Sequence, residues 1–273
     1  MHSLRFNPWI ELPRAVIDVL FRFIQVASSL LGQPPNRKST LKSVMSIARV
    51  HGGREMKLYR FLGAEYGMRS ILERRIRIGR IEELNDDFEF IGVALSEKAD
   101  RIALREMRRH LSVKNGVICM SKDWDSPLMW AHYADSHKGI VLGFDVPEKA
   151  FYEVDYVKKR PTLTDMGLNI LDEITPEDIK RLIRTKADGW AYEQEYRAYV
   201  ALNDGVEING EMHYFMPFSE NMKLREVIVG SRYKGTRTEM VAAVNDPSVD
   251  VYMARGSFEE FKVVRQNQES MWP

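Results

Sequence analysis

The stretch Gly139-Ile140-Val141-Leu142-Gly143-Phe144 decides the fold class of this 273-residue chain. It is a short apolar run flanked by glycine, which is typical of a buried β-strand. Residues 116–121 repeat the pattern around Cys119. Both runs are short for a buried helix, so we predict two strands inside a sheet.

Further strands and helices are predicted on either side of these two. The other strand candidates cover residues 58–62, 77–81, 151–158, 195–202, 226–229, 249–254 and 261–265. The helix candidates cover residues 67–75, 96–111, 127–137, 175–185 and 236–244. Strands outnumber helices and do not alternate regularly with them, which favours an α+β fold with a largely antiparallel sheet and flanking helices. We expect the strand at 151–158 to pair with the strand at 139–144.

The first 55 residues read differently from the main domain, which we place at residues 56–273. Within residues 13–31, charged side chains recur every three or four positions opposite an apolar face, which predicts an amphipathic helix. These charges make it a poor transmembrane span, and no transmembrane segment is expected. We expect residues 13–31 to dock on the main domain or to join two copies into a homo-oligomer. Binding to a membrane surface is the alternative.

Composition limits the classes of function. Lys and Arg number 40 against 39 Asp and Glu, so no overall field attracts nucleic acid. Arginines gather within residues 69–80 and 105–109, either on solvated helix faces or as a site for an anion such as pyrophosphate. Cys119 is the only cysteine, which excludes intramolecular disulfides and predicts a reducing, cytoplasmic location. Its apolar neighbours indicate a buried strand residue rather than a nucleophile.

The stretch 129–139 is the richest in aromatic and titratable side chains. On a helix, Trp130, Tyr133 and His137 share one face, and His132 lies on a neighbouring face with Asp135. An aromatic platform beside histidines suits a planar heteroaromatic ligand such as nicotinamide or adenine. The alternative is an aromatic core helix whose polar tips reach the surface.

A second candidate stretch covers residues 190–200. If the chain is extended there, Glu193, Glu195, Arg197 and Tyr199 project from one strand face. Two carboxylates and a guanidinium on one face could form a cleft wall beside the aromatic residues that precede them. The alternative is a surface strand with an exposed Glu–Arg pair, worth less than about 1 kcal/mol.

The stretch 85–89, Asn-Asp-Asp-Phe-Glu, has the composition of a turn. It lacks the glycine and the spacing of a calcium loop, and no Cys/His group has zinc spacing, so no metal site is expected. The common dinucleotide, P-loop, hydrolase and zinc-protease signatures do not occur. Hydride transfer on a Rossmann fold, phosphoryl transfer on a P-loop and zinc proteolysis are therefore not predicted.

Taken in chain order, these segments resemble a bacterial family known as domain of unknown function 2971. The resemblance covers roughly residues 57–261, and its most specific parts are Trp130-Ala131-His132-Tyr133 and Tyr192-Glu193-Gln194-Glu195-Tyr196-Arg197. The other matching segments are Leu58-Tyr59-Arg60-Phe61, Asn85-Asp86, Phe88-Glu89, residues 117–121, His137-Lys138-Gly139, Gly143-Phe144-Asp145, Trp190 and residues 225–230. Asp87 stands where the family usually has proline, which affects the local turn. The family name implies no activity.

A second resemblance is to ADP-ribosyltransferases, which use NAD as a substrate. Those folds place a strand with Arg or His first, then an aromatic residue near nicotinamide, and then a Glu-x-Glu motif that enters a late strand. Arg60, Tyr133 or Trp130, and Glu193-x-Glu195 occur here in that order. The resemblance implies a toxin or phage-defence enzyme with a protein or nucleic-acid acceptor.

The implied chemistry assigns roles to particular residues. Cleavage of the nicotinamide–ribose bond develops an oxocarbenium-like cation, which Glu195 could stabilise while Glu193 takes a proton from the acceptor. The catalytic candidates are Glu195, Glu193 and His132. The candidates for binding NAD are Arg60, Tyr59, Trp130, Tyr133, Asn85 and Arg197. Two other classes remain open, namely a non-catalytic nucleotide- or partner-binding module and a nucleic-acid-processing enzyme.

Overall fold

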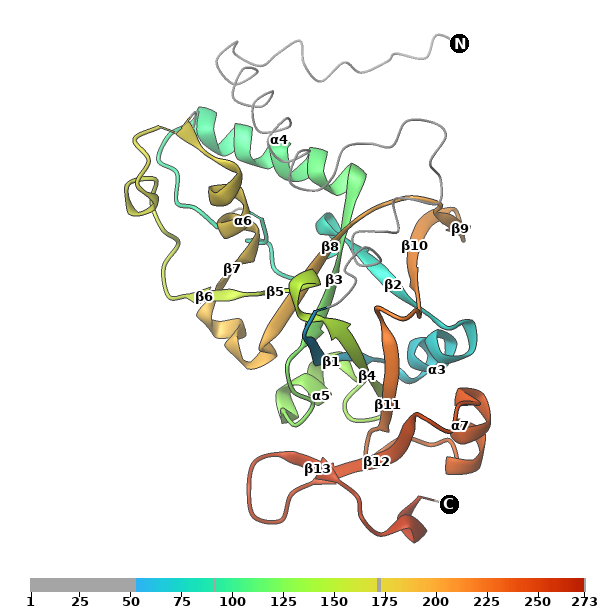
Figure 1. Ribbon diagram of the computed structural model, residues 1–273. Helices are drawn as coiled ribbons and strands as arrows, with labels where there is room; N and C mark the ends of the chain where they lie inside the picture. Colours follow the sequence, from blue (N-terminus) through green and yellow to red (C-terminus); the bar gives the residue numbers. More distant parts are fainter. Residues whose placement is uncertain (1–52, 91, 171–172, 273) are drawn as a thin grey trace.

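A computed structural model describes residues 53–90, 92–170 and 173–272 of the chain (Figure 1). The helix expected at residues 13–31, with its docking or homo-oligomer role, lies outside these described residues. Within them the chain is a mixed α+β structure built around one large, mostly antiparallel sheet. None of the helices in these ranges is long and apolar enough to cross a membrane.

The large sheet contains eleven strands of the described residues. They are β1 (Glu55–Leu62), β2 (Arg75–Arg80), β3 (Asn115–Ser121), β4 (Ile140–Pro147), β5 (Tyr152–Glu153), β8 (Glu195–Ala201), β9 (Val206–Ile208), β10 (Glu211–Pro217), β11 (Lys223–Val229), β12 (Asp250–Gly256) and β13 (Val263–Arg265). Most follow the order β13-β12-β11-β4-β1-β3-β2-β10-β9, while β8 pairs with β3 and β5. The pair β11–β12 is parallel, as is the separate pair of β6 (Asp155–Val157) with β7 (Thr185–Ala187).

The helices fall close to the predicted positions. They are α3 (Ala64–Glu73), α4 (Lys98–Lys114), α5 (Pro127–Tyr133), α6 (Pro176–Arg184) and α7 (Arg237–Val244). Short 3-10 helices are η1 (Ile81–Glu83), η2 (Glu148–Ala150), η3 (Thr164–Met166), η5 (Asp188–Glu193) and η6 (Glu269–Met271). Thr175 and Thr236 each cap a helix by accepting a backbone N–H in a capping box, which explains why α6 and α7 begin where they do.

Alternation along the strands builds a core on each face of the sheet. On β1, Leu58 belongs to the core with Ile71 of α3 and Met240 of α7, whereas Phe61 points to the opposite face. There Phe61 meets Trp130 of α5 edge to face, with ring centroids 5.6 Å apart. The sheet is therefore covered by α3 and α7 on one side and by α5 on the other.

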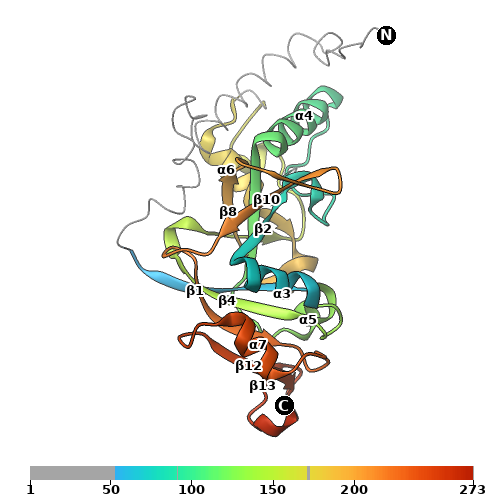
Figure 2. The ribbon, with the colours of Figure 1, turned by 90° about the vertical axis from the view of Figure 1, so that its right-hand side faces the viewer.

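A third core lies beyond the sheet, where α4 and α6 pack with the segments around Ile81 and Phe90. Both views place α4 and α6 together at one end of the molecule, with β12 and β13 at the other (Figure 2). The boundary between this helical core and the sheet runs beside β8, whose Tyr199 ring contacts Phe90 edge to face. Polar side chains on β8 are consequently enclosed between two layers.

The predicted strand at 151–158 does not pair with β4, so that prediction was wrong. The segment splits into β5, which pairs with β8, and β6, which pairs with β7. The physical reason is that β4 has no free edge, because β1 and β11 occupy both of its sides.

Candidate functional site

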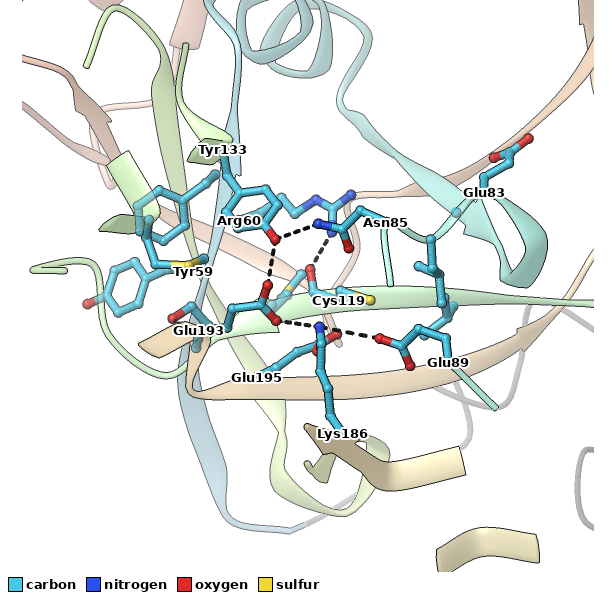
Figure 3. A pocket seen from close by; sticks show the side chains of 17 residues that line it. Tyr59, Arg60, Glu83, Asn85, Glu89, Cys119, Tyr133, Lys186, Glu193 and Glu195 are labelled. Atoms are coloured by element: carbon cyan, nitrogen blue, oxygen red, sulfur yellow. Dashed lines mark hydrogen bonds and ion pairs between the residues drawn. The ribbon is translucent and has the colours of Figure 1, made fainter. Parts of the chain in front are cut away.

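A cavity of about 280 Å³ opens where the sheet forks. Along one edge of β3, β1 pairs only at Ser121, whereas β2 pairs only at Val117 and Gly116. Between these points neither strand pairs with this edge of β3. There the side chain of Arg60 on β1 donates a hydrogen bond to the carbonyl of Cys119 (Figure 3). The fork in the sheet thus creates a side-chain-lined hollow.

Residues from five parts of the chain line this cavity. They are Tyr59, Arg60 and Phe61 of β1, Gly79, Glu83, Leu84, Asn85 and Glu89 of and after β2, Val117, Cys119, Met120 and Ser121 of β3, Met129 and Tyr133 of α5, and Lys186, Glu193 and Glu195 around η5. The apolar part comes mainly from β1, β3 and α5. The polar part is concentrated at the boundary with the helical core.

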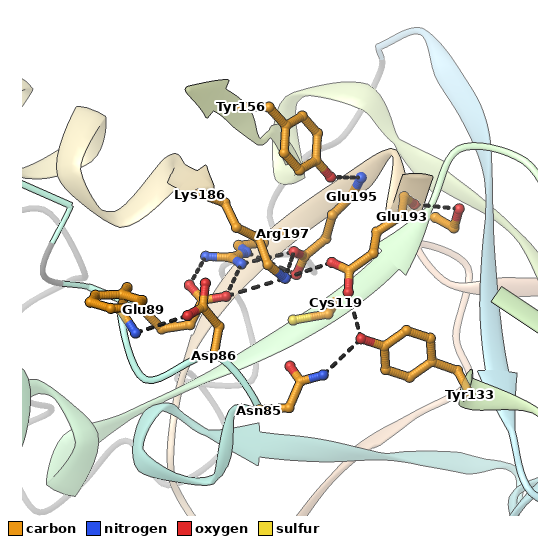
Figure 4. Close-up of polar contacts among 12 residues, drawn as sticks. Asn85, Asp86, Glu89, Cys119, Tyr133, Tyr156, Lys186, Glu193, Glu195 and Arg197 are labelled. Atoms are coloured by element: carbon orange, nitrogen blue, oxygen red, sulfur yellow. Dashed lines mark hydrogen bonds and ion pairs between the residues drawn. The ribbon is translucent and has the colours of Figure 1, made fainter. Parts of the chain in front are cut away.

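Five buried charged side chains form a cluster at that boundary, which we call the buried ionic cluster (Figure 4). Its members are Glu89, Lys186, Glu193, Glu195 and Arg197. Burying single charges is costly, and such groups persist only when they are paired and hydrogen-bonded. Three carboxylates and two cations meet that condition here.

Arg197 binds two carboxylates, one on β8 itself and one in the segment after β2. Its Nε and Nη2 donate to Glu195 at 2.9 and 2.8 Å, and its Nη1 and Nη2 donate to Glu89 at 2.7 and 2.6 Å. Its Nη1 also donates to the carbonyl of Ile183 at 3.1 Å. This fully buried guanidinium therefore joins the sheet to the helical core.

Lys186 is the second cation of the cluster. Its Nζ lies 2.5 Å from Glu193, 3.0 Å from Glu195 and 3.3 Å from Glu89. Burial disfavours the charged ammonium, but the three carboxylates outweigh burial and raise the pKa of Lys186. Lys186 is thus a positive centre that draws the carboxylates together.

The local backbone explains how Glu193 and Glu195 converge on one lysine. Glu193 ends η5, Gln194 adopts a left-handed conformation with φ of 44°, and Glu195 begins β8. The turn is held by Ser121, whose Oγ donates to the Glu193 carbonyl at 2.7 Å, and by Lys122, whose N–H donates to the Gln194 carbonyl at 3.0 Å. The acidic pair is therefore set by a turn rather than by strand alternation.

Glu195 is engaged by both cations of the cluster. It accepts from Arg197 on both oxygens and from Lys186 on one. A carboxylate offers about four acceptor positions, and three of them are taken by these charged donors. Burial opposes ionisation, but Arg197 and Lys186 overcome it and lower the pKa of Glu195 to about 2. Glu195 is consequently a charged anchor at neutral pH.

Glu193 has acceptor capacity left over. Tyr133 donates to its Oε1 at 2.5 Å, Lys186 donates to its Oε2 at 2.5 Å, and Asn85 donates to the Tyr133 hydroxyl at 2.7 Å. Burial raises the pKa of Glu193, and the nearby charge of Glu195 adds to this, against the lowering effect of Lys186. A carboxylate with a raised pKa in a cavity wall is suited to take up and release a proton.

The structure brings together most of the residues singled out from the sequence. Tyr59, Arg60, Asn85 and Tyr133 line the cavity together with Glu193 and Glu195. Arg197 anchors Glu195 and Glu89 and does not line the cavity.

Trp130 and His132 lie elsewhere. Trp130 is fully buried between α5 and the sheet, where its Nε1 donates to the Trp124 carbonyl at 2.7 Å. The predicted helix at 127–137 ends at Tyr133. His137 lies beyond it with a left-handed φ of 67°, and its ring stacks on Trp130. Trp130 and Tyr133 therefore do not form a joint platform in the cavity. His132 is exposed at the surface and is absent from the cavity lining.

Lys186 and Glu89 are the members of the cluster that sequence reasoning did not assign to the site. Glu89 stood in the stretch interpreted as a turn, and Asp86 does serve that turn, because its Oδ1 accepts the N–H of Phe88 at 2.9 Å. Lys186 follows a helix in a three-residue strand. Its signal is weak, because a single lysine in sequence is most often a solvated surface residue.

The arginine groups are largely engaged with neighbouring carboxylates. Arg69 and Arg75 both pair with Glu73, and Arg77 pairs with Glu83. On α4, Arg109 pairs with Glu106, and Arg108 donates to the carbonyl of Asp87. Arg60 differs, because it donates to the Cys119 carbonyl and no carboxylate among the described residues pairs with it.

Comparisons with models of protein families, with curated proteins and with solved structures find no match to this chain. The site therefore has to be interpreted from its own geometry.

Proposed function

We propose that this chain is an ADP-ribosyltransferase-like enzyme that takes the nicotinamide–ribose end of NAD into the forked-sheet cavity. The observation that carries the proposal is Glu193, a carboxylate in the cavity wall with unused acceptor capacity and two donors that fix its position. The order of Arg60, Tyr133 and the Glu-x-Glu segment along the chain supports the same class. The resemblance to the domain-of-unknown-function-2971 family is part of the proposal.

The reaction begins with cleavage of the bond between the anomeric carbon of ribose and the ring nitrogen of nicotinamide. The bonding electron pair leaves with nicotinamide, and the ribose becomes an oxocarbenium-like cation that an adjacent carboxylate stabilises. An acceptor hydroxyl, amine or water then forms the new bond and loses its proton, which Glu193 accepts.

We assign the two glutamates different roles from those that the resemblance implies. Glu193 retains free acceptor positions toward the cavity, so it is the carboxylate that we assign to the reacting ribose and acceptor. Glu195 is committed to Arg197 and Lys186, so we assign it a positioning role. Through Lys186 it keeps the Glu193 carboxylate in place.

Arg60 is suited to the phosphate end of the ligand. It is half-buried, lines the cavity and is free of a carboxylate partner within the described residues. Lys186, the other cation of the lining, already contacts three carboxylates. A guanidinium with unused donors binds phosphate oxygens well.

The test follows nicotinamide release from NAD by chromatography for the wild type, Glu193→Gln and Glu220→Gln. Glu220 is an exposed glutamate outside the cavity and serves as the matched control. We expect release by the wild type and by Glu220→Gln, and a loss of about a hundredfold or more in Glu193→Gln. Binding of NAD without release would support the non-catalytic module instead. Neither binding nor release by the wild type would refute the proposal.

A further inference from the structure

Three aromatic rings form a row that leads away from the cavity. Tyr192 directly precedes Glu193, and its ring centroid lies 6.2 Å from Trp190 and 6.0 Å from His132. His132 in turn lies 6.5 Å from Tyr133, a residue of the cavity lining. The row joins α5 to η5 and begins at the cavity wall.

The row is open to ligands on its outer side. His132 is exposed, and Trp190 and Tyr192 are half-buried. The ammonium of Lys186 lies 5.1 Å from the centre of the Trp190 ring, so the buried ionic cluster supports this ring from within. Rings that are held in place and partly exposed are suited to stack on a planar ligand.

The size of the cavity requires such an extension for a dinucleotide. Pockets that enclose a whole drug-sized ligand span roughly 300–1,000 Å³. A hollow of about 280 Å³ takes one ring with its sugar, and the rest of a dinucleotide must lie outside. A ligand that leaves the cavity past Tyr133 meets the aromatic row.

We infer that Trp190, Tyr192 and His132 form a stacking site for the second base of the dinucleotide whose nicotinamide end fills the cavity. This inference rests on the proposed function and names the part of the ligand that the row binds. It assigns His132 a binding role outside the cavity instead of a catalytic one.

The charges near the row favour a base carried by a small ligand over one carried by a polynucleotide. Asp188 and Asp135 are exposed beside it, Lys138 is paired with Asp135, and Lys186 is buried among carboxylates. Binding of a polynucleotide depends on several cations that neutralise its phosphates. Lys122 is exposed and its N–H donates to the Gln194 carbonyl, but one such lysine does not supply several neutralising cations.

The experiment measures the dissociation constant of AMP by ligand-observed NMR for the wild type, His132→Ala, Tyr192→Leu and Tyr66→Leu. Because His132 is exposed, its truncation leaves the packing intact, and Tyr66, an exposed tyrosine of α3, is the matched control for Tyr192. Loss of a base–aromatic stacking contact weakens binding about fivefold or more. We expect that loss in the first two variants and unchanged affinity in Tyr66→Leu.

Two results would overturn the inference. One is AMP binding that is absent or equal in all four proteins. The other is tighter binding of a ten-nucleotide single strand than of AMP, lost in His132→Ala and Tyr192→Leu, which would assign the row to a polynucleotide. Nicotinamide release from NAD is measured on the same wild-type sample. Nicotinamide release without a loss of AMP affinity in His132→Ala and Tyr192→Leu would refute only the stacking site. A loss of AMP affinity in these variants without nicotinamide release would refute only the proposed reaction.

Discussion

Replacing Arg197 by methionine is expected to destabilise the fold by about 3–5 kcal/mol, the usual cost of leaving a buried charge without its partner. Arg197 is fully buried and supplies the bidentate contacts to Glu195 and Glu89. The lowered pKa of Glu195 is of the same order. It falls from its ordinary value of 4.5 to about 2, and each pKa unit corresponds to about 1.4 kcal/mol, so Arg197 and Lys186 together stabilise ionised Glu195 by about 3–4 kcal/mol.

The assay is urea unfolding at neutral pH, with Arg69→Met as the control. Arg69 pairs with Glu73 on the exposed face of α3, and such a pair is worth less than about 1 kcal/mol. Because the pKa of Glu195 is lowered by folding, its contribution is present above pH 4.5 and is lost as the pH falls toward about 2. Adding Glu89→Gln to Arg197→Met should restore part of the stability, because it removes one uncompensated charge. If Arg197→Met loses no more stability than Arg69→Met, the cluster does not hold the two layers together.

Three further outcomes are expected. Glu193→Gln should lower nicotinamide release but change the free energy of unfolding by less than about 1 kcal/mol. Glu195→Gln should lower the free energy of unfolding by about 3 kcal/mol in the same urea assay. Equal losses of stability in the two variants would contradict the assigned roles. Tyr133→Phe removes a hydrogen bond that lowers the pKa of Glu193, so the acidic limb of the pH–rate profile should move to higher pH; an unmoved limb would exclude Glu193 as the base. Gly139→Ala should lower stability by about 1–3 kcal/mol by thermal unfolding, because the added Cβ would lie 2.1 Å from the Leu62 carbonyl, and a neutral effect would show that this turn is loose.

Local patterns predicted most elements of the fold and its largely antiparallel character, but they missed β9 and β10 and did not give the order of the strands. The strands around Leu58 and Leu142 show in the sequence because short apolar runs and alternation are local properties. The fork at β3 does not show, because it depends on which distant strands reach the two ends of one edge. The same limitation explains why the pairing predicted for the segment 151–158 was wrong. Both edges of β4 are occupied by distant strands, which the local sequence does not show.

The candidate site could be predicted only in part, because local patterns show residue types and their order but not their placement in space. Arg60, Tyr133 and the two glutamates stood out by residue type and order. The roles of the glutamates depend on the left-handed Gln194 between them, which a strand pattern cannot reveal. Lys186 was invisible because its burial is produced by carboxylates from separate parts of the chain.

The order of strands around the cavity also determines when the cavity can exist during synthesis. Arg77 of β2 pairs with Phe215 of β10, and Val117 of β3 pairs with Tyr199 of β8, so early strands have late partners. The ribosome delivers the chain from its N-terminus, and pairings this remote in sequence form slowly. Until β8 and β10 emerge, the edges of β2 and β3 are open templates for aggregation. The nascent chain therefore depends on protection of these edges, and it acquires a complete cavity only after β8 and β10 have been synthesised.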